Sequence, residues 1–314
     1  MVLKPKISST SGHQKSFVGL LSRMAGNPSL VAGGMILGLV VVIAIVAPLV
    51  FNLDPYATDV RNRLTGPGFD HWLGTDNFGR DLFIRLLAGA RTSMMLGAIV
   101  AVSSISLGAI IGILASFYSF LDQLLMRLCD GLMAIPGIML AVALTASFGP
   151  SIPNLIIAMV IVFTPSVARV VRSRALAVKS ETFVEASKAM GSGSLHIMRK
   201  HILPNTFSVM AVQGTFIFAD TIITEAALSF LGAGVPTPEP SWGNILFDGK
   251  MVITRAPHMV ILASIMLVTV VTGLNLLGDG LRDVIDKRGQ NSMSPKFITR
   301  LFGFGRKSAK EVAR

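Results

Sequence analysis

Two acidic residues, Asp220 and Glu225, lie within an apolar stretch over residues 206–231 that is long enough to cross a membrane. Ionisable groups at membrane depth are costly and usually face a cavity or a partner. Each residue therefore either lines a substrate path or makes hydrogen bonds inside a helical bundle, and both alternatives remain open. Because five residues of α-helix leave two side chains about 140° apart, the two acids cannot both face one narrow pore.

A second group of chemically capable residues, Asp70, His71, Asp76 and Asp81, invites interpretation as a metal site. Calcium loops place acidic ligands at alternating positions, and this spacing lacks that alternation. We therefore predict that these residues serve loops and helix caps, with Asp76 capping the helix that follows it. The sequence predicts no metal site and no cofactor held by this chain.

The chain also lacks the short string by which many ATPases hold nucleotide phosphates. No Gly-Lys-Ser or Gly-Lys-Thr sequence occurs anywhere in it. Its five histidines are spread over tails and loops and do not assemble a catalytic set. We predict that the protein is not an enzyme, so the energy for its work must come from outside this chain.

The composition indicates a membrane protein. Of the 314 residues, 52% are hydrophobic and only 14% are charged, with a mean hydropathy of +0.66, whereas soluble domains carry about 25% charged residues. The net charge of +11 raises nucleic-acid binding as an alternative. The long charge-free runs argue against it, because they leave no soluble basic face. The single cysteine, Cys129, excludes an intramolecular disulfide.

The hydrophobic runs predict an all-α integral membrane protein with six transmembrane helices. A break rich in proline at 149–154 divides one long charge-free run, 131–168, into two spans. The predicted spans are 30–51, 92–121, the two halves of 131–168, 206–231 and 256–278. The segment 52–91 is expected to carry a surface helix over 79–91, lying either on the membrane or on the protein's own bundle.

The fixed charges predict the orientation of the chain. Six spans place both tails, 1–29 and 279–314, on one side, together with the connections inside the 92–278 core that face the same way. That side carries 21 basic and 8 acidic residues, whereas the other side carries 7 of each. Because positively charged segments stay in the cytoplasm, we predict that the N and C termini are cytoplasmic.

The longest cytoplasmic connection, 169–205, has the pattern of a docking element. Ser180 is expected to cap a short helix that carries Glu181 in its first turn and ends at Gly191. A second short helix is expected to follow and to end before Pro204. A long structured loop among shorter connections indicates a site for a soluble partner, although simple packing would give the same pattern.

This loop resembles the cytoplasmic EAA loop of permease subunits of bacterial ABC importers. Three further segments, 71–81, 227–243 and 275–283, resemble the dipeptide, oligopeptide and nickel branch of that family. Ser187 stands where the family usually has a second alanine, a small-for-small change, and an ion pair between Glu185 and Lys188 is the alternative role for the glutamate. The loop residues that carry the resemblance are Glu185, Ala186, Ser187, Gly191, His201 and Pro204.

The resemblance implies the transmembrane domain of a type I ABC importer in the bacterial inner membrane. It implies a second homologous permease subunit, two ATPase subunits that hold ATP and Mg²⁺, and a periplasmic or extracellular solute-binding protein. The loop would couple to the ATPases, and Asp220 and Glu225 would lie on the substrate path. Near the outer end, Glu225 would meet the amino terminus of a peptide, with hydrogen bonding inside the bundle as its alternative.

The substrate class follows from the resemblance alone. Dipeptides or oligopeptides are expected, with a nickel complex, glutathione, an opine or a sugar as alternatives. An ion-coupled secondary transporter, with Asp220 and Glu225 as ion carriers, is the competing class. That class predicts inverted repeats, and the two halves of the sequence show no internal similarity. Membrane lipid is an expected partner, and nucleic acid is not.

Overall fold

The computed structural model describes residues 25–51 and 54–292, and nearly all of this length is helical or in turns. The long helices are α2 (Pro28–Phe51), α3 (Leu82–Phe117), α6 (Ile152–Lys179), α9 (Leu203–Phe230) and α11 (Pro257–Ser292). The shorter helices are α4 (Ser119–Met133), α5 (Gly137–Phe148), α7 (Thr182–Ala189), α8 (Ser194–Ile197) and α10 (Trp242–Lys250). A 3₁₀ turn covers Val60–Asn62, and a π-helical turn covers Met198–Ile202.

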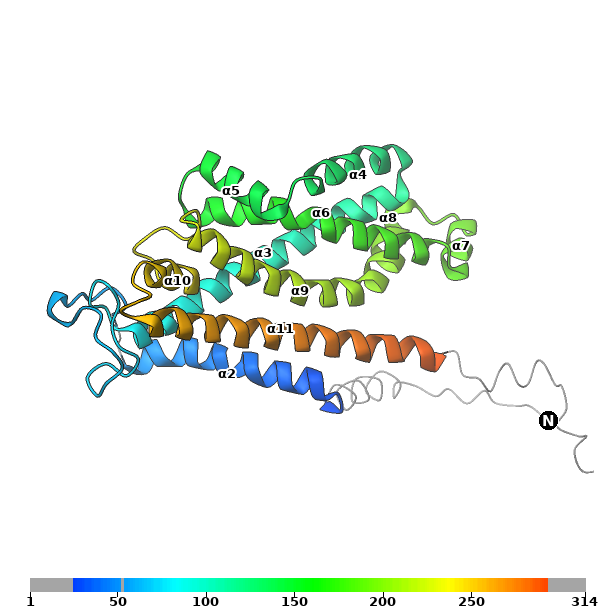
Figure 1. Cartoon of the computed structure of the whole chain (residues 1–314). Helices are drawn as coiled ribbons and strands as arrows, with labels where there is room; N and C mark the ends of the chain where they lie inside the picture. Colours follow the sequence, from blue (N-terminus) through cyan, green and yellow to red (C-terminus); the bar gives the residue numbers. More distant parts are fainter. Residues whose placement is uncertain (1–24, 52–53, 293–314) are drawn as a thin grey trace, which may run out of the picture.

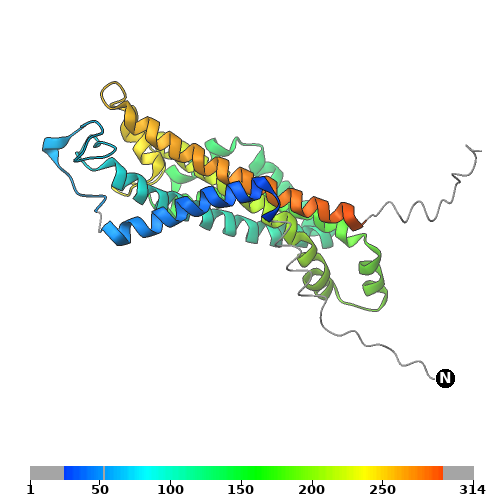
Figure 2. The same ribbon diagram turned by 90° about the horizontal axis from the view of Figure 1, so that it is seen from below.

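Five of these helices are long and apolar enough to cross a membrane, and the bent pair α4–α5 supplies a sixth if it forms one span. The predicted all-α, multi-pass membrane architecture is therefore confirmed. The long helices run roughly alongside one another, with α2 and α11 on one side of the bundle and α4 and α5 on the other (Figure 1). Helix α7 lies at the end of the bundle where the described parts of α2 and α11 begin and finish (Figures 1 and 2).

Small residues bring the central helices into close contact. A methyl group placed on Gly108 of α3 would lie 2.6 Å from Cβ of Val167 in α6. On the other side of the bundle, a methyl group on Gly33 of α2 would lie 2.6 Å from the carbonyl oxygen of Gly273 in α11. Glycine at these crossings lets the helix backbones approach closely. Because lipid is as apolar as the side chains, helices in a membrane associate through such close van der Waals packing and not through the hydrophobic effect.

The third span starts earlier than the sequence predicts. Helix α4 contains charged residues, so a span defined as a charge-free run could not include it. Two of these charges are paired with α6. Arg172 binds Asp122 through two nitrogens at 2.5 and 2.6 Å, and Arg169 lies 2.6 Å from Asp130. A bend of 92° separates α4 from α5. Pro136 stands at this bend, since it cannot continue the hydrogen-bond ladder of α4.

The helix predicted over 79–91 lies on the protein's own bundle, which is one of its two predicted placements, but it is not separate from the span that follows. The helix begins at Leu82 and continues without a break as α3 to Phe117. Its first turns bury Leu82 and Leu86 in the core cluster shared with α10 and α11. The sequence misled because Arg91 interrupts the charge-free run, although a single exposed arginine does not interrupt a helix.

The predicted cap of that helix is also wrong. Asp81, and not Asp76, is the N-cap of α3, and its Oδ1 accepts the N–H groups of Phe83 at 2.9 Å and Ile84 at 3.2 Å. Asp76 lies one turn of chain earlier, where it accepts the N–H groups of a tight turn. Both aspartates bind free amide groups, but only Asp81 directly precedes the helix.

Candidate coupling surface and buried acidic site

Helix α7 is a short helix in the connection between α6 and α9, and it packs on the bundle by one narrow face. Val184 and Ser187, three residues apart, are buried at 3% and 5% exposure. Val184 belongs to the cluster that joins α3, α6 and the π-helical turn. The remaining α7 side chains are exposed, including Glu185 and Ala186 of the EAA-like string. The helix is thus fixed to the bundle from below and open on its outer face.

The C-terminal end of α7 is fixed by glycine. Gly191 has φ of +85°, a left-handed conformation that side chains disfavour. Its N–H donates to the carbonyl of Lys188 at 3.0 Å, and the next residue, Ser192, donates to the carbonyl of Ser187 at 3.1 Å. This pair of bonds is the Schellman arrangement that ends a helix sharply, so the predicted stop at Gly191 is confirmed.

Two details at the ends of the short helices differ from the prediction. Ser180 does not cap α7: it is the C-cap residue of α6, and Glu181 is the N-cap of α7 without a side-chain hydrogen bond. The second short helix does not end before Pro204. It passes through the π-helical turn into α9. Pro204 stands at the start of α9, next to this wide turn, where the missing N–H of proline is tolerated.

The remaining residues of the EAA-like string divide between open and packed positions. In the described part of the chain, Glu185 is exposed and makes no ion pair with Lys188 or any other side chain. The Ser187 hydroxyl donates to the Ser192 hydroxyl at 3.0 Å. The ring of His201 lies 5.7 Å from that of Phe183, which ties the start of α7 to the π-helical turn.

Glu225 is completely buried and is bound by three serines. Its Oε1 accepts the hydroxyls of Ser229 at 2.8 Å and Ser241 at 2.9 Å, and its Oε2 accepts the hydroxyl of Ser93 at 3.2 Å. These serines come from α9, from the N-cap of α10 and from α3. Because its exposed fraction is 0%, the geometry favours the structural role of Glu225 over a place on the substrate path.

The serine hydroxyls are used twice in this site, which we call the Glu225 cage. Besides donating to the carboxylate, they accept the backbone N–H groups of Trp242, Val235 and Asn244. The indole N–H of Trp242 in turn donates to a carbonyl of α3 at 3.1 Å. The cage therefore fixes α10 and the loop before it against α3 and α9. Ser229 lies four residues from Glu225 on the same helix, so their spacing could have shown this contact, but nothing in the sequence shows that Ser93 and Ser241 meet the same glutamate.

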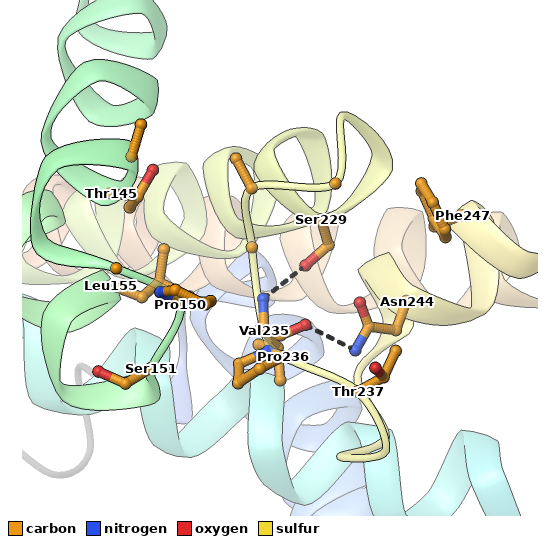
Figure 3. Close-up of a pocket in the computed structure, with 15 residues that line it drawn as sticks. Thr145, Pro150, Ser151, Leu155, Ser229, Val235, Pro236, Thr237, Asn244 and Phe247 are labelled. Carbon is orange, nitrogen blue, oxygen red and sulfur yellow. Dashed lines mark hydrogen bonds between the residues drawn. The ribbon is translucent and has the colours of Figure 1, made fainter.

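A cavity of about 670 Å³ lies beside the cage, between the α5–α6 turn and the loop that precedes α10. Figure 3 shows Ser229 and Asn244 holding the loop by its backbone at Val235, with Pro150 and Ser151 on the opposite wall. Its lining residues are uncharged. The cage thus shapes one wall of a neutral, partly polar cavity at the outer end of α9.

Asp220 occupies the opposite kind of position on the same helix. Its side chain is exposed and makes no hydrogen bond or ion pair with the described residues. It points away from Glu225, as the helical spacing predicts. The structure therefore separates the two acids into a satisfied internal group and an unsatisfied external one.

The outer segment between α2 and α3 is locked by a buried ion-pair network. Arg80 lies 2.6 Å from Asp76 and 3.1 Å from Asp248 of α10, and Arg85 lies 3.4 Å from Asp76. Burial raises the pKa of the Asp248 carboxyl, although the guanidinium of Arg80 opposes that shift. His71, named above with the aspartates as a possible metal ligand, binds Asp81 at 2.8 Å.

These features define a class of protein: a multi-pass helical membrane protein with a short, firmly anchored and largely exposed helix at one end and a buried ion-pair network at the other. Comparison with known families makes the assignment specific. The chain belongs to the family described as binding-protein-dependent transport system inner membrane component, whose pattern matches residues 104–290. It is therefore a permease of the ABC importer type, as its EAA-like loop predicts.

Several curated proteins are similar over most of the chain. A putative peptide transport system permease protein of Brucella suis is 45% identical over 81% of this chain and 86% of its own length. The dipeptide transport system permease protein DppC of Alkalihalophilus pseudofirmus is 40% identical over 83% of this chain and 86% of its own. The glutathione transport system permease protein GsiD of Pectobacterium atrosepticum is 38% identical over 82% and 86%.

A solved structure of the MetNI methionine ABC transporter, in inward-facing conformations, has a similar fold. The TM-score is 0.55 at 21% identity, over 65% of this chain and 96% of the other. At this identity the similarity concerns the fold alone. Together with the family match, it confirms the predicted transmembrane-domain fold of a type I ABC importer.

Proposed function

We propose that this chain is a permease subunit of an ATP-driven importer that carries peptides across the bacterial inner membrane. Relatives that cover most of the chain are named for peptide, dipeptide and glutathione transport, and glutathione is itself a short peptide. A nickel complex, an opine or a sugar remains the alternative cargo. In this proposal the chain forms the path, and both its termini face the cytoplasm, where its positive charge is concentrated.

The observation that carries the proposal is the seating of α7. A helix transmits force only if it is rigid and fixed at both ends, and α7 is anchored through Val184 and Ser187 and stopped at Gly191. Its open face presents Glu185 and Ala186 to a partner. We infer that this face docks on an ATPase subunit, that ATP and Mg²⁺ bind to the ATPases, and that this chain contributes no ATPase site.

The docking role is tested by Gly191→Pro in the assembled importer. Proline fixes φ near −65° and removes the N–H that donates to Lys188, so the helix end is lost. We expect substrate uptake in reconstituted vesicles to fall at least tenfold while the protein still inserts into the membrane. The matched control is Gly193→Ala, at an exposed glycine with φ of −68° and no atom near its missing side chain. Normal uptake by Gly191→Pro contradicts the proposal.

Asp220 marks the face of α9 that we assign to the substrate path. Gln213 and Thr224 lie within about 40° of it on the helix, so one stripe of this span is polar. None of the three makes a side-chain hydrogen bond in the described part of the chain. Polar groups at membrane depth need water or a partner, and no side chain within residues 25–51 and 54–292 serves this stripe as a partner. We propose that it faces the path shared with the second permease subunit.

Asp220 would then bind the ammonium group of a peptide in transit. Asp220→Asn preserves the shape of the side chain and removes its charge. We expect uptake of a peptide with a free amino terminus to fall about tenfold, and uptake of the N-acetylated peptide to change little. The control is Asp279→Asn, an exposed acid near the cytoplasmic end of α11. Equal losses for both peptides contradict recognition of the amine.

A further inference from the structure

An apolar groove of about 640 Å³ runs between α2 and α3, away from the polar stripe of Asp220. One wall is the α2 face of Val41, Ala44 and Ile45, which are spaced three and four residues apart. Phe218 of α9 forms the floor, with its ring lying directly on Gly97 of α3. The groove is open along its length, since the side chain of Ile45 is 55% exposed.

The opposite wall carries a charge at one end only. Met94, Met95 and Ala98 of α3 line the groove, and Arg91 stands above them on the same helical face. Small side chains on facing walls, Ala44 and Ala98, leave the space that forms the groove. Between Arg91 and Ala98, about 10 Å along the helix, this wall therefore changes from a charged surface to an apolar one.

Arg91 stands where the charged start of α3 gives way to the apolar length of the helix. It is the last charged residue before the charge-free run 92–121. Its side chain is exposed, and within the described ranges it makes no hydrogen bond or ion pair. Arg85 in the first turns of α3 and Arg80 just before that helix are both buried and both paired with carboxylates. Arg91 is thus a cation for which residues 25–51 and 54–292 supply no counter-ion.

We propose that this groove is a binding site for an anionic phospholipid of the outer leaflet. The guanidinium of Arg91 would bind the phosphate group through charged, two-pronged hydrogen bonds. One acyl chain would lie in the groove against Met94, Met95 and Ile45. The order of the groups, cation first and apolar surface below it, matches the order of headgroup and chain in a lipid. Charge complementarity selects an anionic headgroup, because no acidic side chain of the described residues pairs with Arg91: Glu239, which lines a neighbouring pocket with it, accepts the hydroxyl of Tyr56 instead.

The bound lipid would be a structural part of the permease. It would fill the space between α2 and α3, which the small residues of both helices leave open. This site is independent of peptide transport and of the coupling loop, because it shares no residue with either. Failure of the lipid proposal therefore leaves the proposed function untouched.

The test measures lipid retained by the intact importer after extraction from nanodiscs that contain equal amounts of phosphatidylglycerol and phosphatidylcholine. Native mass spectrometry counts the lipids bound to each complex. We expect the wild type to retain phosphatidylglycerol in excess, and Arg91→Gln to reduce that excess about tenfold. Arg91→Lys should retain part of it. The matched control, Arg61→Gln, removes an exposed outer cation away from the groove and should change nothing.

A second variant tests the acyl-chain part of the site. Ala98→Phe fills the groove without altering charge, and we expect it to reduce retention of both lipids. Millimolar inorganic phosphate should not displace the bound lipid, because the groove contributes to binding. Three outcomes overturn the proposal: full retention by Arg91→Gln, displacement of the lipid by phosphate alone, or photo-crosslinking of a benzoylphenylalanine at position 45 to the second permease subunit instead of to lipid.

Discussion

The outer and cytoplasmic ends of this bundle treat their polar groups in opposite ways. At the outer end, Asp76, Arg80, Asp248 and Glu225 are all buried and all bound to one another or to hydroxyls within the chain. At the cytoplasmic end, most of α7 is exposed, and Glu185 has no partner in the described structure. An end that satisfies its own polar groups needs no partner to hold it, whereas for the exposed face of α7 we propose a second protein as the partner.

The largest expected effect comes from breaking the outer ion-pair network. Asp76→Ala leaves Arg80 and Arg85 buried without their shared carboxylate, and removal of one partner of a buried pair costs about 3–5 kcal/mol. We expect the free energy of unfolding to fall by that amount, as measured by chemical denaturation in detergent. The exposed Asp70→Ala should change it by less than about 0.5 kcal/mol. Equal stability of both variants would show that the outer end is not self-sufficient.

A smaller loss is expected from the Glu225 cage. Glu225→Ala leaves three buried hydroxyls without their acceptor, which costs about 2–4 kcal/mol. Asp220→Ala, on the exposed face of the same helix, should leave the free energy of unfolding nearly unchanged. Thermal unfolding of the two purified variants compares them directly. A larger loss for Asp220→Ala would reverse the assignment of internal and external roles.

The smallest expected effect concerns the rim of the outer end. Burial, followed by the hydrogen bond that its hydroxyl donates to Glu239 at 2.9 Å, raises the pKa of Tyr56 above the ordinary value of 10.0. The folded state therefore holds this proton more tightly than the unfolded state does. The stability contributed by the contact is present below pH 10 and is lost as pH rises through the folded-state pKa.

That effect is measured by absorbance titration in a Tyr118→Phe background, where Tyr56 is the only tyrosine left. We expect its midpoint to shift down towards the ordinary value when Glu239→Gln removes the acceptor charge. An unchanged midpoint would mean that the Tyr56–Glu239 hydrogen bond does not stabilise the folded state. The stabilising polar network of the outer end would then extend no further than Asp248.

Much of the fold is predictable because the membrane limits the choice of structure. Charge-free runs of sufficient length must be helices, and α2 and α9 lie close to their predicted bounds, whereas α11 begins as predicted but continues past the predicted end at 278 to Ser292. The errors fall where a charge was used as a boundary. Arg91 and Asp122 both lie inside helices. The helices accommodate these charges because Arg91 is exposed and Asp122 is paired with Arg172.

The coupling loop was predictable for a local reason, and the cage was not. The stop at Gly191 depends on one backbone conformation that glycine adopts easily, so a single residue reveals it. The cage depends on Ser93, which is 132 residues distant from Glu225 along the chain. A pairing across that distance is set by how α3 packs on α9, and no spacing in the sequence contains it.

The sequence by itself determined the class of this protein. Its hydropathy sets helices of membrane length, its basic residues set the orientation, and its EAA-like string indicates a partner. The tertiary structure alone decided which polar groups are satisfied. In the sequence, Asp220 and Glu225 are simply two acids in an apolar run. In the described structure, Glu225 meets three serine hydroxyls and Asp220 meets no side-chain partner. The reason is physical, because the free energy of a charge in a membrane depends on its neighbours, and packing chooses them.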